Sequence, residues 1–359
     1  MASKNTIRTP LTALLGIKHP IFLAGMNVAA GPELAAAVTN AGGIGVIGGV
    51  GYSPKFLQQQ IDDLKAGLDD KGAPFGVDLL LPKVGDGARA TNKDYTGGKL
   101  GELIDIICGS GAKLFVCAVG VPPRWAVDKL HAANILVMNM VGAPKHVPKA
   151  LGAGVDLICA QGGEGGGHTG DVPTSILIPA CVDLCRGRTS PMSGEPVAVV
   201  AAGGIYDGRG LAMALALGAQ GVWVGTRFVA SKEAGAPPRH QQAVLECGYH
   251  DTVRTVIYTG RPMRVRRNAY NADWEENRAG EIKTLTAAGK LPIMDDLSKQ
   301  VEEGKEFSTK ERMELMPLLM GKVAGAITEV LPAAVIMADM VDGAADVLRG
   351  AAGAITSKL

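Results

Sequence analysis

Short apolar runs alternate with stretches of helical length between residues 20 and 247 of the chain. Several of the helical stretches open with proline, which is favoured at the first position of a helix. Runs that are apolar throughout are typical of parallel strands, because such strands are buried on both faces. Eight strands that are each followed by a helix predict an α/β fold, a closed (β/α)8 TIM barrel. The predicted strands are residues 20–24, 44–47, 75–81, 113–119, 135–141, 155–160, 197–202 and 221–228.

The alternation ends near Cys247. A basic stretch at 261–267 and a charged linker follow, and a last region with a helical pattern runs from about residue 309 to residue 350. We therefore divide the chain into a barrel core, residues 1–250, and a loop and mainly helical region, residues 251–359, which we expect to pack on the barrel mouth as a lid. The active site of such a barrel lies at the carboxyl ends of its strands.

The charge balance bears on the kind of partner. Lys and Arg total 36 against 35 for Asp and Glu, so the net charge of +1 gives no global field that would select nucleic acid. The basic stretch 261–267 contains no aromatic residue, and we interpret it as a solvated face or as contacts to a cofactor phosphate. No apolar stretch is long enough to span a bilayer. We expect a small-molecule substrate, with neither nucleic acid nor a membrane as partner, and leave the oligomeric state open.

Cysteine usage and the chain ends bear on the compartment. The six cysteines are scattered, mostly within apolar runs, as reduced thiols are, and we expect no metal site. The first residues lack the apolar core of a secretory signal. The last three, Ser357-Lys358-Leu359, match the peroxisomal targeting signal. We expect a peroxisomal protein if the source is eukaryotic and a cytoplasmic one otherwise.

Residues 160–170 form the most unusual segment. Six glycines surround Glu164 and His168, directly after the apolar run 155–159. Glycine buries no side chain and loses the most entropy on folding, so we expect a loop whose bare N–H groups approach an anionic ligand. His168 is the side chain there whose charge changes near neutral pH, which predicts acid–base chemistry beside a bound phosphate. Glu164 could orient the imidazole, bind cofactor hydroxyls or cap local amides.

Two more glycine loops follow the last two predicted strands. Gly203 and Gly204 come after residues 197–202, and Gly225 and Thr226 lie near the end of the run 221–228. In eight-stranded barrels the loops at these two positions commonly bind phosphate with their amides and a short helix N-terminus. The alternative is that the glycines at 203 and 204 only make a tight turn.

Together these motifs resemble those of the nitronate monooxygenases, formerly called 2-nitropropane dioxygenases. The resemblance is carried by the loop at 160–168, by Ala201-Ala202-Gly203-Gly204-Ile205 and by the segment 218–228, and it extends from about residue 20 to residue 228. It implies a barrel that binds FMN without a covalent bond. NAD(P)H:quinone reductases and enoyl-acyl carrier protein reductases are relatives of this family and share the histidine loop.

The resemblance implies roles for individual residues. Gly25 and Met26 would pass along the isoalloxazine ring, and Gln161 would contact the flavin or its ribityl chain. Gly166 and Gly167 would approach the flavin with their backbone. The phosphate would be held by Gly203, Gly204, Gly225 and Thr226.

Asp78 departs from the family pattern. It stands in Gly76-Val77-Asp78-Leu79, where many relatives carry asparagine, and the resemblance places it near the flavin. An acid at this position lacks the donor of the amide and would alter the electronics of the ring.

The resemblance predicts an FMN-dependent oxidoreductase that converts nitronates or nitroalkanes and O2 into carbonyl compounds and nitrite. His168 would remove the α-proton of a nitroalkane, since an unperturbed imidazole pKa suits a general base, or it would bind the anion if the substrate is already a nitronate. The alternative is an FMN-dependent reductase that takes hydride from NAD(P)H and reduces a quinone or an enoyl thioester. A flavin-binding protein without turnover is a third hypothesis.

Overall fold

The computed structural model describes residues 3–355 and contains a barrel of eight parallel strands. Their order around the sheet is β1-β9-β8-β6-β5-β4-β3-β2, and two backbone hydrogen bonds of 3.0 Å link Ile44, just before β2, to Ile21 and Leu23 of β1. Each strand overlaps one of the eight predicted runs, so the predicted barrel is confirmed. The strands are β1 (Ile21–Leu23), β2 (Gly45–Gly49), β3 (Phe75–Leu80), β4 (Leu114–Ala118), β5 (Leu136–Val141), β6 (Leu157–Gln161), β8 (Ala198–Ala202) and β9 (Gly221–Val224).

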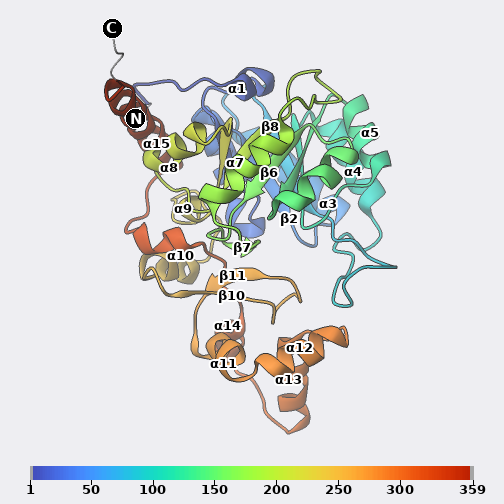
Figure 1. Cartoon of the computed structure of the whole chain (residues 1–359). Helices are drawn as coiled ribbons and strands as arrows, with labels where there is room; N and C mark the ends of the chain where they lie inside the picture. The colour runs from blue at the N-terminus through green and yellow to red at the C-terminus, as the bar shows by residue number, and fades with distance from the viewer. Residues whose placement is uncertain (1–2, 356–359) are drawn as a thin grey trace.

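Helices that follow the strands cover the outside of the barrel (Figure 1). In α3 the buried residues Leu57, Ile61 and Leu64 recur at intervals of four and three, which places them on one face of the helix. The side chain of Ser53 accepts a hydrogen bond from the N–H of Phe56 and so fixes where α3 begins. The helices after the first seven strands are α2 (Pro32–Asn40), α3 (Pro54–Gly67), α4 (Leu100–Ser110), α5 (Arg124–Ala132), α6 (Val147–Gly152), α7 (Thr174–Cys185) and α8 (Gly208–Ala216), with the short helices η1 (Asn27–Ala30) and η2 (Pro144–His146) before α2 and α6.

The inside of the barrel is filled with side chains. Phe22 and Trp223, from neighbouring strands, belong to one buried cluster with Val116 and Met138 from the opposite side of the sheet. The short helix α1 (Pro10–Leu15) adds two leucines to the same cluster. Since the interior is packed rather than open, ligands have access only at the ends of the strands.

The last helix, α15 (Ala333–Gly353), differs from our expectation of a lid. It packs against α8 and α2 on the outside of the barrel, with Ile336 and Met340 buried in the same cluster as those helices (Figure 1). A Cβ added at Gly208 of α8 would lie 2.4 Å from the backbone nitrogen of Ala344, so the two helices approach closely. This helix therefore takes the eighth helical position of the barrel, and residues 225–332 are inserted between β9 and that helix.

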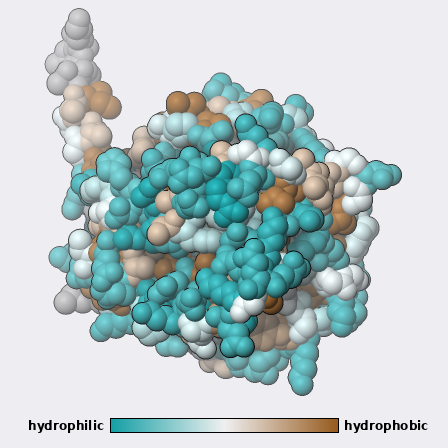
Figure 2. All heavy atoms as spheres, turned by 90° about the horizontal axis from the view of Figure 1, so that it is seen from below, coloured by the Kyte–Doolittle hydropathy of each residue, from teal (hydrophilic) through white to brown (hydrophobic). Residues whose placement is uncertain are grey.

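The inserted residues form a layer at the carboxyl ends of the strands. The hairpin of β10 (Thr252–Thr255) and β11 (Met263–Arg266) pairs with β7 (Gly167–His168), which extends from the loop after β6. Beyond the hairpin, four helices pack around the buried Trp274, and Figure 2 shows a largely hydrophilic surface on this side of the molecule. The helices of the insertion are α9 (Thr226–Val229), α10 (Pro238–Leu245), α11 (Ala269–Asn277), α12 (Ala279–Ala287), α13 (Pro292–Glu302), α14 (Thr309–Leu315) and η3 (Lys322–Ala326).

Two expectations concern the membrane and the chain end. Among residues 3–355, no helix combines the length and apolar character needed to cross a bilayer. The tripeptide Ser357-Lys358-Leu359 lies outside the described residues.

The position of α15 predicts a large effect on stability. Met340 is 1% exposed, and Met340→Ala should lower the free energy of unfolding by about 2–5 kcal/mol, because the substitution leaves a cavity between α15 and the barrel. Val347 lies on the same helix at 41% exposure, so Val347→Ala is the matched control. Urea unfolding followed by circular dichroism measures both variants. Equal, small losses for the two would contradict the role of α15 as a barrel helix.

Candidate active site

Four of the loops singled out from the sequence meet at one part of the barrel rim. The strands β6, β8, β9 and β1 are consecutive neighbours in the sheet, so the loops that follow them are adjacent. These loops carry Gln161, the pair at 203 and 204, the pair at 225 and 226, and Gly25. The structure thus brings together residues that lie up to 200 positions apart in the sequence.

The glycines of the loop after β6 approach other parts of the chain. A Cβ added at Gly166 would lie 2.6 Å from the backbone of Met320, and one added at Gly170 would lie 2.2 Å from the backbone oxygen of Gly142. Arg264 of β11 donates from Nε and Nη2 to the carbonyl oxygen of Gly163, at 3.1 and 2.8 Å. Packing therefore requires these glycines, apart from the approach to a ligand that we expected of them, because they let three segments cross at the mouth.

His168 is held at the mouth by the hairpin of the inserted layer. The antiparallel ladder pairs it with Met263, and its Nε2 atom lies 3.0 Å from Oγ1 of Thr259. A hydroxyl both donates and accepts, so Thr259 supports either tautomer of the ring. Burial, and to a smaller extent the charge of Arg261, lowers the pKa of His168 from 6.5 to about 4. The imidazole is neutral at physiological pH, and its pKa is not the unperturbed one that we expected.

Arg261 contributes a positive charge beside His168. Its guanidinium donates from Nε to Asn92 Oδ1 at 3.0 Å and from Nη1 to the carbonyl oxygen of Val119 at 3.2 Å. Val119, just after β4, has a φ of 70°, a strained conformation for a β-branched residue. In the described part of the chain no carboxylate lies within salt-bridge distance of Arg261. The mouth therefore has an excess of positive charge next to a neutral imidazole.

Gln161 and Glu164 both hold the loop in shape. The Nε2 group of Gln161 donates to the carbonyl oxygen of His168 at 2.8 Å, which fixes the backbone that carries the imidazole. The carboxylate of Glu164 accepts hydrogen bonds from the N–H and the hydroxyl of Thr174, at 3.0 and 2.7 Å. Thr174 is the first residue of α7, so Glu164 caps that helix, the third of the three roles left open from the sequence.

The loops after β8 and β9 present backbone amides at the rim. Gly203 and Gly204 have φ values of 88° and 75° and turn the chain where β8 ends. The short helix α9 starts at Thr226. The N–H groups of Phe228 and Val229 donate to the carbonyl oxygen of Gly225, so those of Thr226 and Arg227 are the ones without a partner within the helix. The hydroxyl of Thr226 accepts a hydrogen bond of 2.9 Å from the N–H of Gly321, in the inserted segment.

The glycines of these two loops differ in what surrounds them. A Cβ added at Gly203 would lie 2.8 Å from the backbone oxygen of Gly162, so the tight turn requires glycine there. A Cβ added at Gly225 would make only ordinary contacts, at 3.4 Å to Met26 Sδ and 3.5 Å to Ala24 Cβ. Gly204 also has room, with Glu164 Cβ at 3.5 Å, but its φ of 75° would strain any other residue, so Gly225 is the one of the three that can be enlarged without strain.

Asp78 lies inside the barrel near the mouth. Its register neighbours are Gly48 of β2 and Val116 of β4, and Val116 belongs to the interior cluster, so the carboxyl group faces inward. Its Oδ2 lies 2.5 Å from the position of a Cβ added at Gly25, which places it directly below the loop after β1. Its Oδ1 is buried and finds no hydrogen-bond partner within residues 3–355, and burial raises the pKa of Asp78 to about 8.

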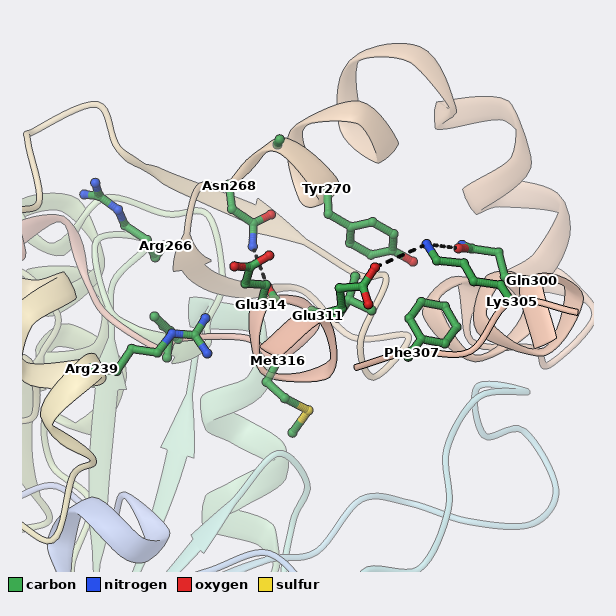
Figure 3. Close-up of a pocket in the computed structure, with 13 residues that line it drawn as sticks. Arg239, Arg266, Asn268, Tyr270, Gln300, Lys305, Phe307, Glu311, Glu314 and Met316 are labelled. Carbon is green, nitrogen blue, oxygen red and sulfur yellow. Dashed lines mark hydrogen bonds and ion pairs between the residues drawn. The ribbon is translucent and has the colours of Figure 1, made fainter. Parts of the chain in front are cut away.

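A separate pocket of about 390 Å³ lies between α10, α11 and α14 (Figure 3). Its polar groups are engaged with one another: Lys305 Nζ lies 3.0 Å from Gln300 Oε1 and 4.0 Å from Glu311 Oε1, and Arg239 donates to the carbonyl oxygen of Met313. It adjoins the carboxyl end of β11, the opposite end from the one that pairs with His168. The candidate active site is therefore the barrel mouth.

The comparisons with known proteins agree with this geometry. The model of the family described as nitronate monooxygenase matches residues 8–343. The chain belongs to the nitronate monooxygenase family. It is 33% identical to a probable nitronate monooxygenase of Staphylococcus saprophyticus, over 74% of this chain and 80% of that protein. It is also 33% identical to a (3aS,4S,5R,7aS)-5-hydroxy-7a-methyl-1-oxo-octahydro-1H-indene-4-carboxyl-CoA dehydrogenase of Mycobacterium tuberculosis, over 95% of this chain and 92% of that one.

Among solved structures, FabK from Thermotoga maritima superposes with a TM-score of 0.76 at 30% identity, over 98% of this chain and all of that one. Nitronate monooxygenase family members are flavoproteins, and the chain is accordingly a flavin-dependent oxidoreductase, as the sequence resemblance implied. The hypothesis of a flavin-binding protein without turnover is therefore dropped. Because the relatives carry the names of different oxidoreductases, family membership alone does not select the substrate.

Sequence reasoning missed the contribution of the inserted layer to the site. Thr259 and Arg264 contact His168 or its loop, and the charge of Arg261 acts on the imidazole. The sequence interpretation of the basic stretch 261–267, a solvated face or contacts to a cofactor phosphate, does not include these roles. The available signal was the alternation of arginine with apolar residues in Met263-Arg264-Val265-Arg266, which is typical of a strand.

The lowered pKa of His168 predicts a distinctive titration. In the folded protein the imidazole should stay neutral from about pH 8 down to about pH 5 and gain its proton near pH 4. The unfolded chain takes up this proton near pH 6.5, so the contribution to stability is complete above that pH and is lost as the pH falls toward 4. Imidazole proton NMR measures the titration, with the resonance assigned by its absence in His168→Asn. A midpoint at 6.5 would contradict the buried environment of the ring.

Proposed function

We propose that the chain binds FMN across the barrel mouth and oxidises nitronates with O2 to carbonyl compounds and nitrite. The observation that supports it most is the neutral imidazole of His168 in the field of the Arg261 guanidinium. Among the described residues this guanidinium has hydrogen-bond partners but no carboxylate partner. A nitronate is a small anion, and it would supply the negative charge that this part of the mouth lacks. The flavin, when bound, supplies the electron acceptor, while the protein supplies position and charge.

The mouth offers features suited to both ends of an FMN. Free N–H groups at the start of α9 and the turn at 203 and 204 suit the phosphate, and Gly225 leaves room there for close approach. At the other end, the unpartnered carboxyl of Asp78 below Gly25 suits a polar edge of the ring. The isoalloxazine would then lie along Gly25 and Met26, and Gly166, Gly167 and Gln161 would bound it from the side of β6.

The pKa of His168 favours a preformed nitronate over a neutral nitroalkane as substrate. An imidazole that binds a proton only near pH 4 is a weak base, so it would remove the α-proton of a nitroalkane slowly. The same neutral ring can donate a hydrogen bond from Nδ1 to a nitronate oxygen when the hydroxyl of Thr259 donates to its Nε2. Arg261, which is held by Asn92, would hold the anion from the other side.

A second candidate is an oxidoreductase that acts on a coenzyme A thioester or uses NAD(P)H. The observation that favours it is the identity of 33% with the coenzyme A dehydrogenase over nearly the whole chain. Arg254 of β10 lies 3.7 Å from Asp171 and is partly exposed, so it could meet a nucleotide phosphate, whereas its register partner Arg264 is engaged by the carbonyl oxygen of Gly163.

Anaerobic mixing separates the two candidates. The FMN-loaded protein is mixed with propyl-2-nitronate, with NADH, with NADPH and with 3-hydroxybutyryl-CoA, and the flavin absorbance near its visible maximum is followed. Bleaching by the nitronate alone supports the proposed function. Fast bleaching by a pyridine nucleotide or by the thioester, with no response to nitronate, would replace it with the second candidate. A correctly folded protein that does not bind FMN would contradict both.

A further inference from the structure

The carboxyl group of Asp78 has an unusual environment for an acid. It is 2% exposed, and its Oδ1 has no hydrogen-bond partner among the described residues. Burial of an unpaired polar group costs free energy, and proteins usually offset this cost with a hydrogen bond or an opposite charge. Neither is present in the part of the chain that the structure describes, and the carboxyl group, carried by β3, lies directly below the loop after β1 at the mouth.

The groups that surround Asp78 cannot hold it as an anion. The titratable groups close enough to Asp78 to interact with its charge are Tyr52, after β2, the thiol of Cys159 in β6 and, on the outer side of β4, the thiol of Cys117. Burial raises the pKa of Tyr52 to about 12 and those of both thiols well above 9, so all three are neutral near pH 7. No cation contributes to the pKa of Asp78, which burial alone raises. Near neutral pH this side chain is therefore a carboxylic acid with a proton to donate.

We infer that Asp78 donates a hydrogen bond from its protonated carboxyl group to the flavin ring and couples reduction of the flavin to the uptake of one proton. The inference rests on the proposed binding of FMN at the mouth. It gives this chain a property that asparagine at the same position lacks, because an amide can donate a hydrogen bond but cannot change its protonation.

The coupling follows from charge repulsion between two neighbouring groups. Two-electron reduction leaves negative charge on the flavin ring, and a nearby anion disfavours the charged form of a carboxyl group. Asp78 therefore keeps its proton to higher pH beside the reduced flavin than beside the oxidised one. Consider a pH between the pKa of Asp78 beside the oxidised flavin and its higher pKa beside the reduced flavin. There the chemical reductant supplies two electrons to the flavin, and the solvent supplies one proton to the Asp78 carboxylate in addition to any proton that the flavin takes up.

The test compares the reduction potential of the FMN-loaded protein from about pH 6 to about pH 10 in three forms: wild type, Asp78→Asn and Asp86→Asn. Asp86 is exposed in the loop after β3 and serves as the matched control. In the wild type and the control, the reduction potential should fall more steeply with rising pH above about pH 8 than below it. The change in slope should correspond to one more proton taken up per two electrons. Asp78→Asn should lack this break.

A second readout does not depend on the variant or on turnover. The reduced-minus-oxidised infrared spectrum of the wild-type protein above about pH 8 should contain the carbonyl band of a newly protonated carboxylic acid. A wild-type potential without the break, or the same break in Asp78→Asn, would overturn the inference and leave the proposed function standing. Failure of the folded wild-type protein to bind FMN would overturn both.

Discussion

Replacement of His168 by alanine should lower kcat/KM by very different factors for two forms of the same substrate. A neutral nitroalkane is the slow substrate, because His168 is a weak base, and its remaining turnover still depends on that base, so we expect a loss of about 10²–10⁴. For the preformed nitronate the loss should be smaller, roughly tenfold to hundredfold, which corresponds to one hydrogen bond to a charged group. The imidazole is neutral and is fixed by Thr259, so the substitution removes a defined contact from the mouth.

Both rates are measured by nitrite release with the FMN-loaded protein. The flavin content of each preparation is determined first, because His168→Ala should leave FMN bound. His250 is exposed and distant from β7 in the sequence, so His250→Ala is a suitable control and should match the wild type. Unchanged activity of His168→Ala on both substrates would remove this residue from the site. Equal losses on both would show that it binds the anion without acting as a base.

The barrel could be predicted from the sequence because its signals are local. Each strand is a short apolar run, such as 135–141, and its burial on both faces follows from composition alone. The eighth helical position could not be predicted in the same way. About a hundred residues separate β9 from α15, and an apolar helical face such as that of Ile336 and Met340 does not reveal whether it covers a mouth or a barrel wall.

The candidate site was predictable only in part, for a related reason. The loops after β6, β8 and β9 were found because barrel topology places them at one rim. The pairing of β11 with β7 joins residues almost a hundred positions apart through a strand of two residues, which has no sequence pattern. The lowered pKa of His168 depends on that pairing, because burial under the hairpin is its main cause. Sequence thus indicated the residue type but not its protonation.

Enlargement of Gly225 should abolish firm retention of FMN. Gly225→Leu places a branched side chain where the amides that open α9 would meet the phosphate, and loss of one or two charge-assisted hydrogen bonds weakens binding roughly tenfold to a thousandfold. The backbone has room for the new Cβ, which would be 3.4 Å from the nearest atom, so the fold should be preserved. Gly203 is a poor choice for the same experiment, because its φ of 88° and a contact of 2.8 Å would make any side chain disturb the turn itself.

Flavin content after gel filtration and the dissociation constant from fluorescence titration with FMN measure the effect. Gly101→Leu, in a helix with open space around the added atoms, is the matched control and should retain the flavin. Circular dichroism and the urea midpoint establish that Gly225→Leu is folded. If the folded variant holds FMN as tightly as the wild type, the phosphate does not bind at α9. The anion site would then have to lie elsewhere on the rim, and the arginines of the β10–β11 hairpin would be the next groups to replace.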